Sequence, residues 1–455
     1  MNQNSLERRS FCRALAGTTA GLAFSRTGWA DEDVASVNLS ARSEWLNVAG
    51  RSLNLYTYER QYPGPAIRIK PGNRVVIKFL NLLTEPTNLH FHGLHIPSTG
   101  SADNSFLRIE RGQSFTYDFE IPQNHPGGTF WYHPHHHGMA AKQLSRGLAG
   151  MIIVRGVLDE IPEIAQAPES LLMLQDFAVN GQGVPTEPGM MERMQGREGA
   201  LILINGQLNP AFAINRNGWL RLRIVNASAS RFYRLRIEDH MMYQIASDGG
   251  ALPTVRELDE LLLTPGERAE IMVRGEREPG EYRILNLPYD RGRMGMMGMR
   301  VAPSSSGPIG SLRYEGEAES EWTLPQSLAT VEPLPEPEVR RYFRLDESMM
   351  EFTINRRTFD ARRTDTSVRL NAIEEWEFDN PTDMDHPMHI HTNPFQVVGT
   401  DGRVIPEWKD VTLVKSRARV RVRMRFDDFT GPTLYHCHIL DHEDLGMMGR
   451  LDILS

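Results

Sequence analysis

The chain has 455 residues, of which 58 are acidic and 50 basic, so its formal net charge is −8 with the histidines neutral. This acidic balance argues against nucleic acid as a partner. No segment approaches the roughly 20 apolar residues that a membrane-spanning helix requires, so no membrane span is expected. The length predicts two to four domains.

Residues 1–30 resemble a twin-arginine export signal. The pair Arg8-Arg9 precedes a mildly apolar run at residues 14–24 and a small-residue cleavage site near Ala30. Removal of this segment takes away four arginines and one glutamate, a net of +3, which changes the net charge from −8 to −11. We therefore expect a periplasmic or otherwise extracytoplasmic protein that the twin-arginine export machinery carries.

A strand pattern that ends in asparagine occurs three times, at residues 74–81, 219–226 and 375–380. Its alternation of apolar and polar residues predicts β-strands. Nine and eleven residues after the asparagines lie His90 and His92, then Leu235 and Ile237, then His389 and His391. The middle copy therefore has apolar residues where the outer copies have histidines.

The second half of the repeat links residues 130–135, Phe-Trp-Tyr-His-Pro-His, with residues 433–438, Thr-Leu-Tyr-His-Cys-His. Pro134 stands where the later copy has Cys437, and Leu148 stands where it has Met447. The first copy therefore lacks both sulfur side chains.

These repeats predict an all-β protein of three consecutive β-sandwich domains, because many short strands with frequent turn signals are typical of sandwiches. We expect the domains at residues 36–155, 165–303 and 340–455. Stretches rich in proline, serine and glycine near residues 156–169 and 303–339 are the expected linkers.

Four His-x-His pairs lie in the two outer domains. They are His90/His92, His133/His135, His389/His391 and His436/His438. Residues two apart in a strand point to the same face, so each pair directs two imidazoles one way. Eight imidazoles suit copper, and four from each outer domain predict that the first and third domains meet. A zinc hydrolase is the alternative, but it gives Cys437 no role.

Cys437 is the single cysteine outside the export signal, because Cys12 lies within that signal. Together with His386, His442 and Met447 it makes the ligand set of a blue-copper site, two imidazoles and a thiolate with a weak axial thioether. A buried, inert cysteine is the alternative. Alternation along the strand turns Cys437 away from His436 and His438, so one tripeptide would join two metal centres.

These motifs resemble those of three-domain multicopper oxidases, in the branch of bacterial laccases and copper-efflux oxidases. The resemblance implies cupredoxin-like Greek-key domains and four copper ions. The type 1 ion would have the ligands His386, Cys437, His442 and Met447. The type 2 ion would have His90 and His389, and the two type 3 ions would share His92, His133, His135, His391, His436 and His438. The implied activity is one-electron oxidation of a substrate at type 1 and reduction of dioxygen to water at the other three ions.

Two acidic residues resemble the proton-relaying carboxylates of that family. Asp103 follows the first histidine pair, and Glu443 lies beside the predicted ligand His442. A carboxylate close to the copper ions is a natural proton relay. Glu443 could equally be a solvated charge.

The sequence leaves the substrate open between phenols or aromatic amines and Cu(I). Methionines cluster at Met190, Met191 and Met194 and at Met294, Met296, Met297 and Met299, and thioethers suit Cu(I). The second cluster could instead be the last strand of the middle domain. Copper-efflux oxidases have a methionine-rich insertion early in the third domain, where this chain has only Met349-Met350.

Beside His386, the residues Asp383, Met384 and Asp385 could bind substrate copper or a cationic aromatic amine. A third reading is a copper-free cupredoxin-fold scaffold that acts in the envelope or in cell division. Loss of copper ligands would mark that class, and none is missing. We expect a monomer.

Overall fold

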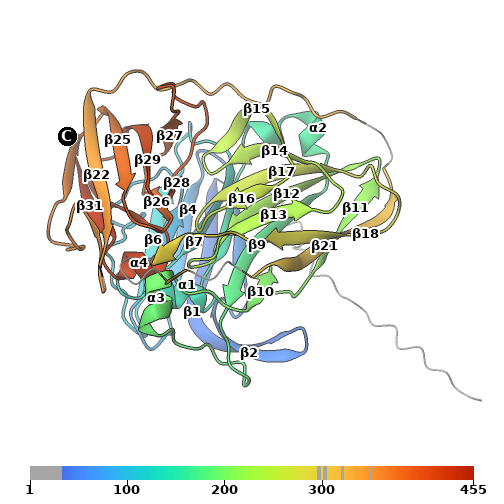
Figure 1. Cartoon of the computed structure of the whole chain (residues 1–455), viewed down its shortest axis with the longest axis horizontal. Coiled ribbons are helices and arrows are strands. Elements are labelled where there is room, and N and C mark those ends of the chain that lie inside the picture. The colour runs from blue at the N-terminus through green and yellow to red at the C-terminus, as the bar shows by residue number, and fades with distance from the viewer. Residues whose placement is uncertain (1–32, 295–298, 301–304, 319–321, 349) are drawn as a thin grey trace, which may run out of the picture.

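The computed structural model describes residues 33–294, 299–300, 305–318, 322–348 and 350–455. The predicted export signal lies outside these residues. Within them the chain forms mainly short β-strands, and the longest α-helices have six residues. Six sheets of four to six strands pack in pairs, which gives three β-sandwiches in chain order (Figure 1). The predicted all-β fold of three consecutive cupredoxin-like Greek-key domains is confirmed.

The first domain packs two four-stranded sheets around a core that includes Phe79, Phe91 and Tyr117. One sheet has the order β2 (Arg51–Tyr58), β1 (Val34–Val48), β4 (Arg74–Asn81), β6 (Ser114–Glu120). The other has the order β3 (Gly64–Ile69), β8 (Gly150–Val154), β7 (Gly128–His133), β5 (His90–His92). The helix α1 (Ala140–Ser145) connects β7 to β8.

The second domain packs a six-stranded sheet against a five-stranded sheet. The first has the order β10 (Leu201–Ile204), β9 (Glu169–Phe177), β12 (Trp219–Asn226), β17 (Arg268–Arg274), β14 (Met242–Ser247), β15 (Gly250–Leu258). The second has the order β11 (Ala211–Arg216), β21 (Gly307–Glu317), β18 (Glu281–Leu287), β13 (Tyr233–Ile237), β16 (Leu261–Leu263). The helix α3 (Met190–Gln195) lies between β9 and β10 in sequence. The small pair β19 (Arg293–Met294) and β20 (Met299–Arg300) lies between β18 and β21.

The third domain packs two five-stranded sheets. One has the order β23 (Phe352–Ile354), β22 (Val339–Glu347), β25 (Ile373–Asn380), β29 (Ala418–Arg425), β27 (Phe395–Val398). The other has the order β24 (Thr366–Arg369), β31 (Met448–Leu454), β30 (Gly431–Cys437), β26 (His386–Ile390), β28 (Val411–Val414). The helix α4 (Leu440–Asp444) follows β30.

The asparagine that ends each repeated strand has the same structural role in all three domains. Asn81, Asn226 and Asn380 are fully buried. Each side-chain amide donates hydrogen bonds to carbonyls on two separate segments and accepts one from the backbone two residues further on. Buried backbone groups need such partners. The asparagine therefore stabilises the turn that leads into the strand carrying histidines in the outer domains.

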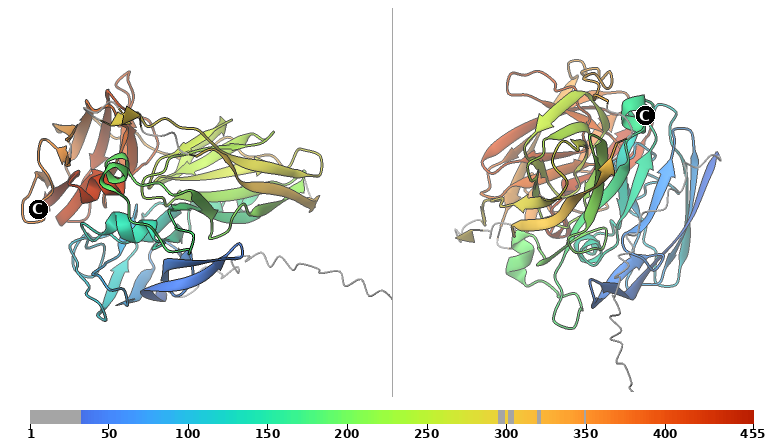
Figure 2. Two further views of the ribbon diagram at one scale, coloured as in Figure 1. Left: turned by 60° about the horizontal axis from the view of Figure 1, so that its bottom comes forward. Right: turned by 90° about the vertical axis from the view of Figure 1, so that its right-hand side faces the viewer.

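The first and third domains lie against each other, and the second extends from their common edge (Figure 2). Helices α1 and α4 pack together where the outer domains meet, and α3 packs against α4 from the second domain. The histidine-bearing strands β5, β7, β26 and β30 all belong to the two outer domains. The interface of these domains therefore positions the candidate site.

Both stretches predicted as linkers contain some regular structure. The first contains the short helices η1 (Val157–Asp159) and α2 (Pro162–Ala165). The second contains β21, which pairs with β11 and β18 of the second domain, so that domain extends beyond residue 303. Residues 309–312 of this strand are buried in the sheet despite the glycine and proline in its first half. The other predicted domain boundaries stay predictions.

Among the described helices, none is long and apolar enough to cross a membrane.

Candidate copper centres

The eight predicted histidines converge on the boundary between the first and third domains. His90 lies opposite His133 in the β5–β7 pair, and His389 lies opposite His436 in the β26–β30 pair. All eight are at most 1% exposed. Alternation along the strands and the antiparallel pairing within each domain turn these imidazoles toward the partner domain.

The imidazoles form three groups whose ring nitrogens lie within 4.8 Å of one another. The groups are His90/His92/His389, His92/His133/His438 and His135/His391/His436. The Nε2 atoms of His90 and His389 are 3.4 Å apart, and those of His135 and His436 are 3.0 Å apart. Each group combines residues of both outer domains, so neither domain alone can build the site.

Burial keeps seven of the eight imidazoles neutral. It is the largest cause that lowers the pKa of these seven, and neighbouring imidazoles lower it further. A neutral imidazole offers a lone pair to a metal. Both ring nitrogens of His438 are buried without a hydrogen-bond partner. Unsatisfied buried nitrogens among other imidazoles fit copper, which satisfies them by coordination.

A separate cluster of His386, Cys437 and His442, which we call the thiol group, lies within the third domain. The Sγ atom of Cys437 is 3.6 Å from Nδ1 of His386 and 3.9 Å from Nδ1 of His442, and these two nitrogens are 3.4 Å apart. All three side chains are fully buried. Burial raises the pKa of the Cys437 thiol. Since metals bind the thiolate, copper at this position would displace the proton.

Hydrogen bonds on the far side fix both imidazoles of the thiol group. Nε2 of His386 lies 3.1 Å from Oγ1 of Thr382, and Nε2 of His442 donates to the carbonyl of Met194 at 3.1 Å. Both rings therefore turn Nδ1 toward Cys437. Met447 is fully buried in the same core cluster, and its backbone carbonyl accepts a hydrogen bond from Cys437. These contacts fit the predicted type 1 ligand set.

The thiol group is joined to two of the imidazole groups through the chain itself. Cys437 belongs to the thiol group, whereas His436 and His438 belong to two different imidazole groups. The three residues are consecutive, so a short covalent path connects the candidate centres.

Both predicted carboxylates contact the imidazoles. Asp103 lies 2.9 Å from Nδ1 of His90 and accepts a hydrogen bond from the backbone of Phe91, and burial raises its pKa to about 8. An Oε2 atom of Glu443 lies 3.2 Å from Nδ1 of His436 and 3.8 Å from Nε2 of His135. Burial raises the pKa of Glu443 well above its ordinary value.

The three residues before His386 do not converge on one site. Asp383 pairs with Arg417 at 2.7 Å, and Met384 is fully buried. Asp385 accepts hydrogen bonds from the hydroxyl of Tyr289 and the backbone of Ser416, both at 2.7 Å. Consecutive residues point in different directions here, so their proximity in sequence does not produce a shared ligand set.

The first methionine cluster lies on α3, over the thiol group. Met190 and Met191 are 44% and 38% exposed, whereas Met194 is buried beside His442. In the second cluster, Met296 and Met297 lie outside the described residues, and the side chains of Met294 and Met299 are likewise not described.

Sequence reasoning missed Asp410 and Arg268. Asp410 lies 3.0 Å from Nε2 of His92, its carbonyl accepts a hydrogen bond from His389, and Arg268 binds both of its carboxylate oxygens. Asp410 directly precedes the apolar strand β28. A charged residue before a strand is ordinary, so the sequence offers no signal for this role.

Comparisons with known proteins agree with this arrangement. Models of the multicopper oxidase family match residues 41–158, 128–316 and 333–454. A multicopper oxidase of Staphylococcus haemolyticus is 30% identical over 413 residues, 88% of this chain and 84% of that protein. The cell division protein FtsP of Dickeya dadantii is 28% identical over 429 residues, 90% of this chain and 87% of that protein.

Among solved structures, a multicopper oxidase of Campylobacter jejuni, described as a metallo-oxidase, superposes with a TM-score of 0.83 at 30% identity. The match covers 94% of this chain and 93% of that one. Sequence, fold and clustered imidazoles thus agree: the chain belongs to the multicopper oxidase family and is a copper-dependent oxidoreductase.

Proposed function

We propose that this protein couples oxidation of a substrate to reduction of dioxygen, with four copper ions held at the predicted ligands. Copper supplies the one-electron oxidation at the thiol group and the four-electron reduction of dioxygen to water at the imidazole groups. The type 1 ligands are His386, Cys437, His442 and Met447. The type 2 ligands are His90 and His389, and the type 3 ligands are His92, His133, His135, His391, His436 and His438. The observation that carries this proposal is the connection of the buried thiol group to two of the three imidazole groups through one tripeptide.

The protein residues supply position, a covalent connection and protons. Cys437 lies between His436 and His438, so its backbone offers a through-bond route from the thiol group to the imidazole groups. Asp103 lies against His90, and Glu443 lies against His436. Each carboxyl group is placed to hold a proton beside the position where dioxygen reacts.

We propose Cu(I) as the preferred substrate over phenols. Both imidazoles of the thiol group are fully buried, and α3 covers His442 through the carbonyl of Met194. Phe352 stacks on a face of that ring, with centroids 3.8 Å apart. A bulky phenol therefore has no exposed imidazole edge to contact. The exposed thioethers of Met190 and Met191 lie on the same helix and suit a small, soft cation.

Oxygen uptake by the copper-loaded protein tests the activity and the substrate together. The protein is offered Cu(I) and a phenol in parallel, each with and without added Cu(II). Uptake with Cu(I), and phenol turnover only after Cu(II) is added, would support a cuprous oxidase in which bound copper mediates. Strong phenol turnover without added copper would show a laccase.

A copper-free scaffold is the second candidate, favoured by the similarity to a cell division protein. Copper content separates it from the oxidase. A purified protein that binds no copper and consumes no oxygen with either substrate would support the scaffold.

We also propose that the protein is a monomer exported to the periplasm by the twin-arginine machinery. The pair Arg8-Arg9 and the following apolar run support the proposed export route. Replacement of both arginines by lysine should leave the protein in the cytoplasm, which fractionation of expressing cells would detect.

A further inference from the structure

Arg268, the first residue of β17, binds all three domains although the second domain carries no predicted copper ligand. Its Nε donates to the carbonyl of Thr129 in the first domain at 3.2 Å, and its backbone N–H donates to Asp248 within the second domain at 2.8 Å. Its two terminal nitrogens donate to the carboxylate oxygens of Asp410 in the third domain, at 2.7 and 2.5 Å. The Arg268 side chain is fully buried. A buried bidentate pair of this kind is strong and directional.

Asp410 in turn contacts one imidazole from each outer domain. Its Oδ1 atom lies 3.0 Å from Nε2 of His92, and its backbone carbonyl accepts a hydrogen bond from Nδ1 of His389 at 2.8 Å. The two rings stack with centroids 3.8 Å apart and planes 10° apart. One residue therefore orients two imidazoles that the proposed function assigns to different copper ions.

The contact with Asp410 also determines which nitrogen of His92 faces the cluster. An ionised carboxylate can only accept a hydrogen bond, so Nε2 of His92 carries the hydrogen and Nδ1 keeps its lone pair. That Nδ1 atom lies 3.4 Å from Nε2 of His133. Arg268 donates to both carboxylate oxygens of Asp410, at 2.7 and 2.5 Å. The carboxylate thus remains an acceptor.

Gly93, directly after His92, leaves space for the contact between Arg268 and Asp410. Gly93 has a φ of +87°, and a Cβ atom at this position would clash with the Arg268 guanidinium and lie 2.7 Å from Oδ2 of Asp410. Only glycine combines this backbone conformation with the close approach of Arg268. The close approach of Arg268, a residue of the second domain, therefore explains why glycine follows the first histidine pair.

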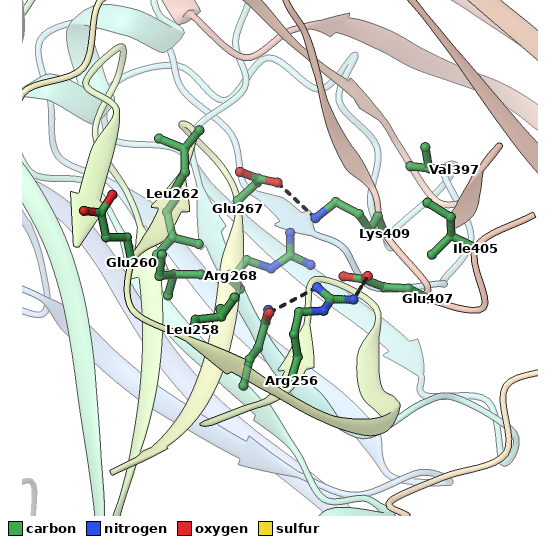
Figure 3. Close-up of a pocket in the computed structure, with 13 residues that line it drawn as sticks. Arg256, Leu258, Glu260, Leu262, Glu267, Arg268, Val397, Ile405, Glu407 and Lys409 are labelled. Carbon is green, nitrogen blue, oxygen red and sulfur yellow. Dashed lines mark hydrogen bonds and ion pairs between the residues drawn. The ribbon is translucent and has the colours of Figure 1, made fainter. Parts of the chain in front are cut away.

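Other ion pairs cross the same interface without touching a predicted ligand. A cavity of about 370 Å³ lies between the second and third domains, and Arg268 is among its lining residues. Figure 3 shows Lys409 paired with Glu267, and Arg256 paired with Glu407, on either side of the Arg268 guanidinium. The Arg256–Glu407 pair, at 2.7 Å, joins the same two domains and provides a control for loss of an interdomain ion pair, with the Arg256 side chain 45% exposed.

We propose that Arg268 and Asp410 form an interdomain clamp that orients His92 and His389, which makes Arg268 a positioning residue for the copper cluster. The inference rests on the proposed function, because it has a role only if these histidines bind copper. Removal of Arg268 leaves a buried carboxylate without its cation, which is unfavourable. The carboxylate would reorient, and His92 would lose its fixed tautomer.

The test compares Arg268→Gln, Arg268→Lys and Asp410→Asn with the control Arg256→Gln in the copper-loaded protein. Copper per chain, the type 1 absorption and the electron paramagnetic resonance spectrum of type 2 copper are measured. We expect the first and third variants to keep type 1 absorption but bind cluster copper about 10- to 100-fold more weakly, as is usual for loss of a ligand's hydrogen-bond partner. Lysine should restore part of the binding, because it keeps the charge but not the bidentate geometry.

An unchanged copper content and spectrum in Arg268→Gln would overturn the clamp, as would equal losses in Arg256→Gln. If the variants fail to fold, a crystal structure of the copper-loaded wild type tests the clamp, because it shows which nitrogen of His92 binds copper. Copper on Nδ1 of His92, with Nε2 on Asp410, supports the clamp, and copper on Nε2 refutes it. A wild type that binds no copper contradicts the proposed function, whereas four coppers in both the wild type and Arg268→Gln contradict only the clamp.

Discussion

His442 donates a hydrogen bond from Nε2 to the backbone carbonyl of Met194, 3.1 Å away on a helix of another domain. The contact turns Nδ1 of His442 toward Cys437 and places α3 over the outer edge of the candidate type 1 site. Two exposed methionines, Met190 and Met191, lie on the solvent side of the same helix. The second domain therefore both orients a predicted ligand and covers the approach to it.

Replacement of Met190 and Met191 by leucine should lower kcat/KM for Cu(I) about tenfold, which corresponds to about 1.4 kcal/mol of binding. Leucine keeps the apolar volume but removes the soft sulfur donors. Oxygen uptake at varied Cu(I) concentrations measures the effect.

Met350→Leu is the control, because Met350 is 60% exposed on the third domain. It should leave Cu(I) oxidation unchanged. Equal rates for wild type and the double variant with Cu(I) would exclude α3 as the copper entry surface.

Replacement of Cys437 by serine should remove one copper per chain and the intense type 1 absorption. The hydroxyl has nearly the shape of the thiol but is not the soft thiolate that copper favours here. The imidazole groups should keep their copper, because their nitrogens come from other residues. Metal analysis with absorption spectroscopy measures both effects, and retention of blue colour would contradict the ligand assignment.

Replacement of Asp103 by asparagine should slow dioxygen reduction about 10- to 100-fold, because His90 loses its carboxylate partner. Reduction of the type 1 site by substrate, measured without oxygen, should remain at the wild-type rate, since Asp103 lies in the imidazole cluster. Stopped-flow absorption separates the two half-reactions. A slower type 1 reduction would show that the substitution disturbs more than the cluster.

Replacement of Asn226 by alanine should destabilise the protein by about 2 to 4 kcal/mol, because three buried hydrogen bonds are lost. Asn226 lies in the domain without predicted ligands, so copper content should not change. Thermal unfolding followed by circular dichroism measures the loss of stability. A variant as stable as the wild type would contradict the structural role assigned to the repeated asparagines.

Glu169 should contribute to stability only above acidic pH. Burial acts to raise its pKa, but Arg223 and two further arginines outweigh burial and lower the pKa from 4.5 to about 2. Because the folded pKa is depressed, the stabilisation is present above about pH 4.5 and is lost as the pH falls toward 2. Glu169→Gln should therefore be less stable than wild type at pH 7, and the difference should shrink between pH 4.5 and 2. Urea unfolding across this range measures it, and a constant difference would contradict the prediction.

The sequence by itself determined the strand pattern, the threefold repeat and the separation of Cys437 from its neighbouring histidines. Each is encoded over a few residues, because alternation along a strand fixes which side chains share a face. The asparagine ending each repeat could also be recognised, since the same local hydrogen bonds recur in all three domains. The strand β21 could not be recognised in the predicted linker, because its glycine and proline residues weaken the strand pattern.

The tertiary structure decided which imidazoles share a group, because every group combines residues from two domains. It also assigned Asp410 and Arg268 to the cluster, although Asp410 follows His92 by 318 residues. It separated Asp383, Met384 and Asp385, which are adjacent in sequence but face different surroundings. Local order follows from neighbouring residues, whereas contacts between domains depend on the burial and charge pairing of distant segments, which no short pattern in the sequence records.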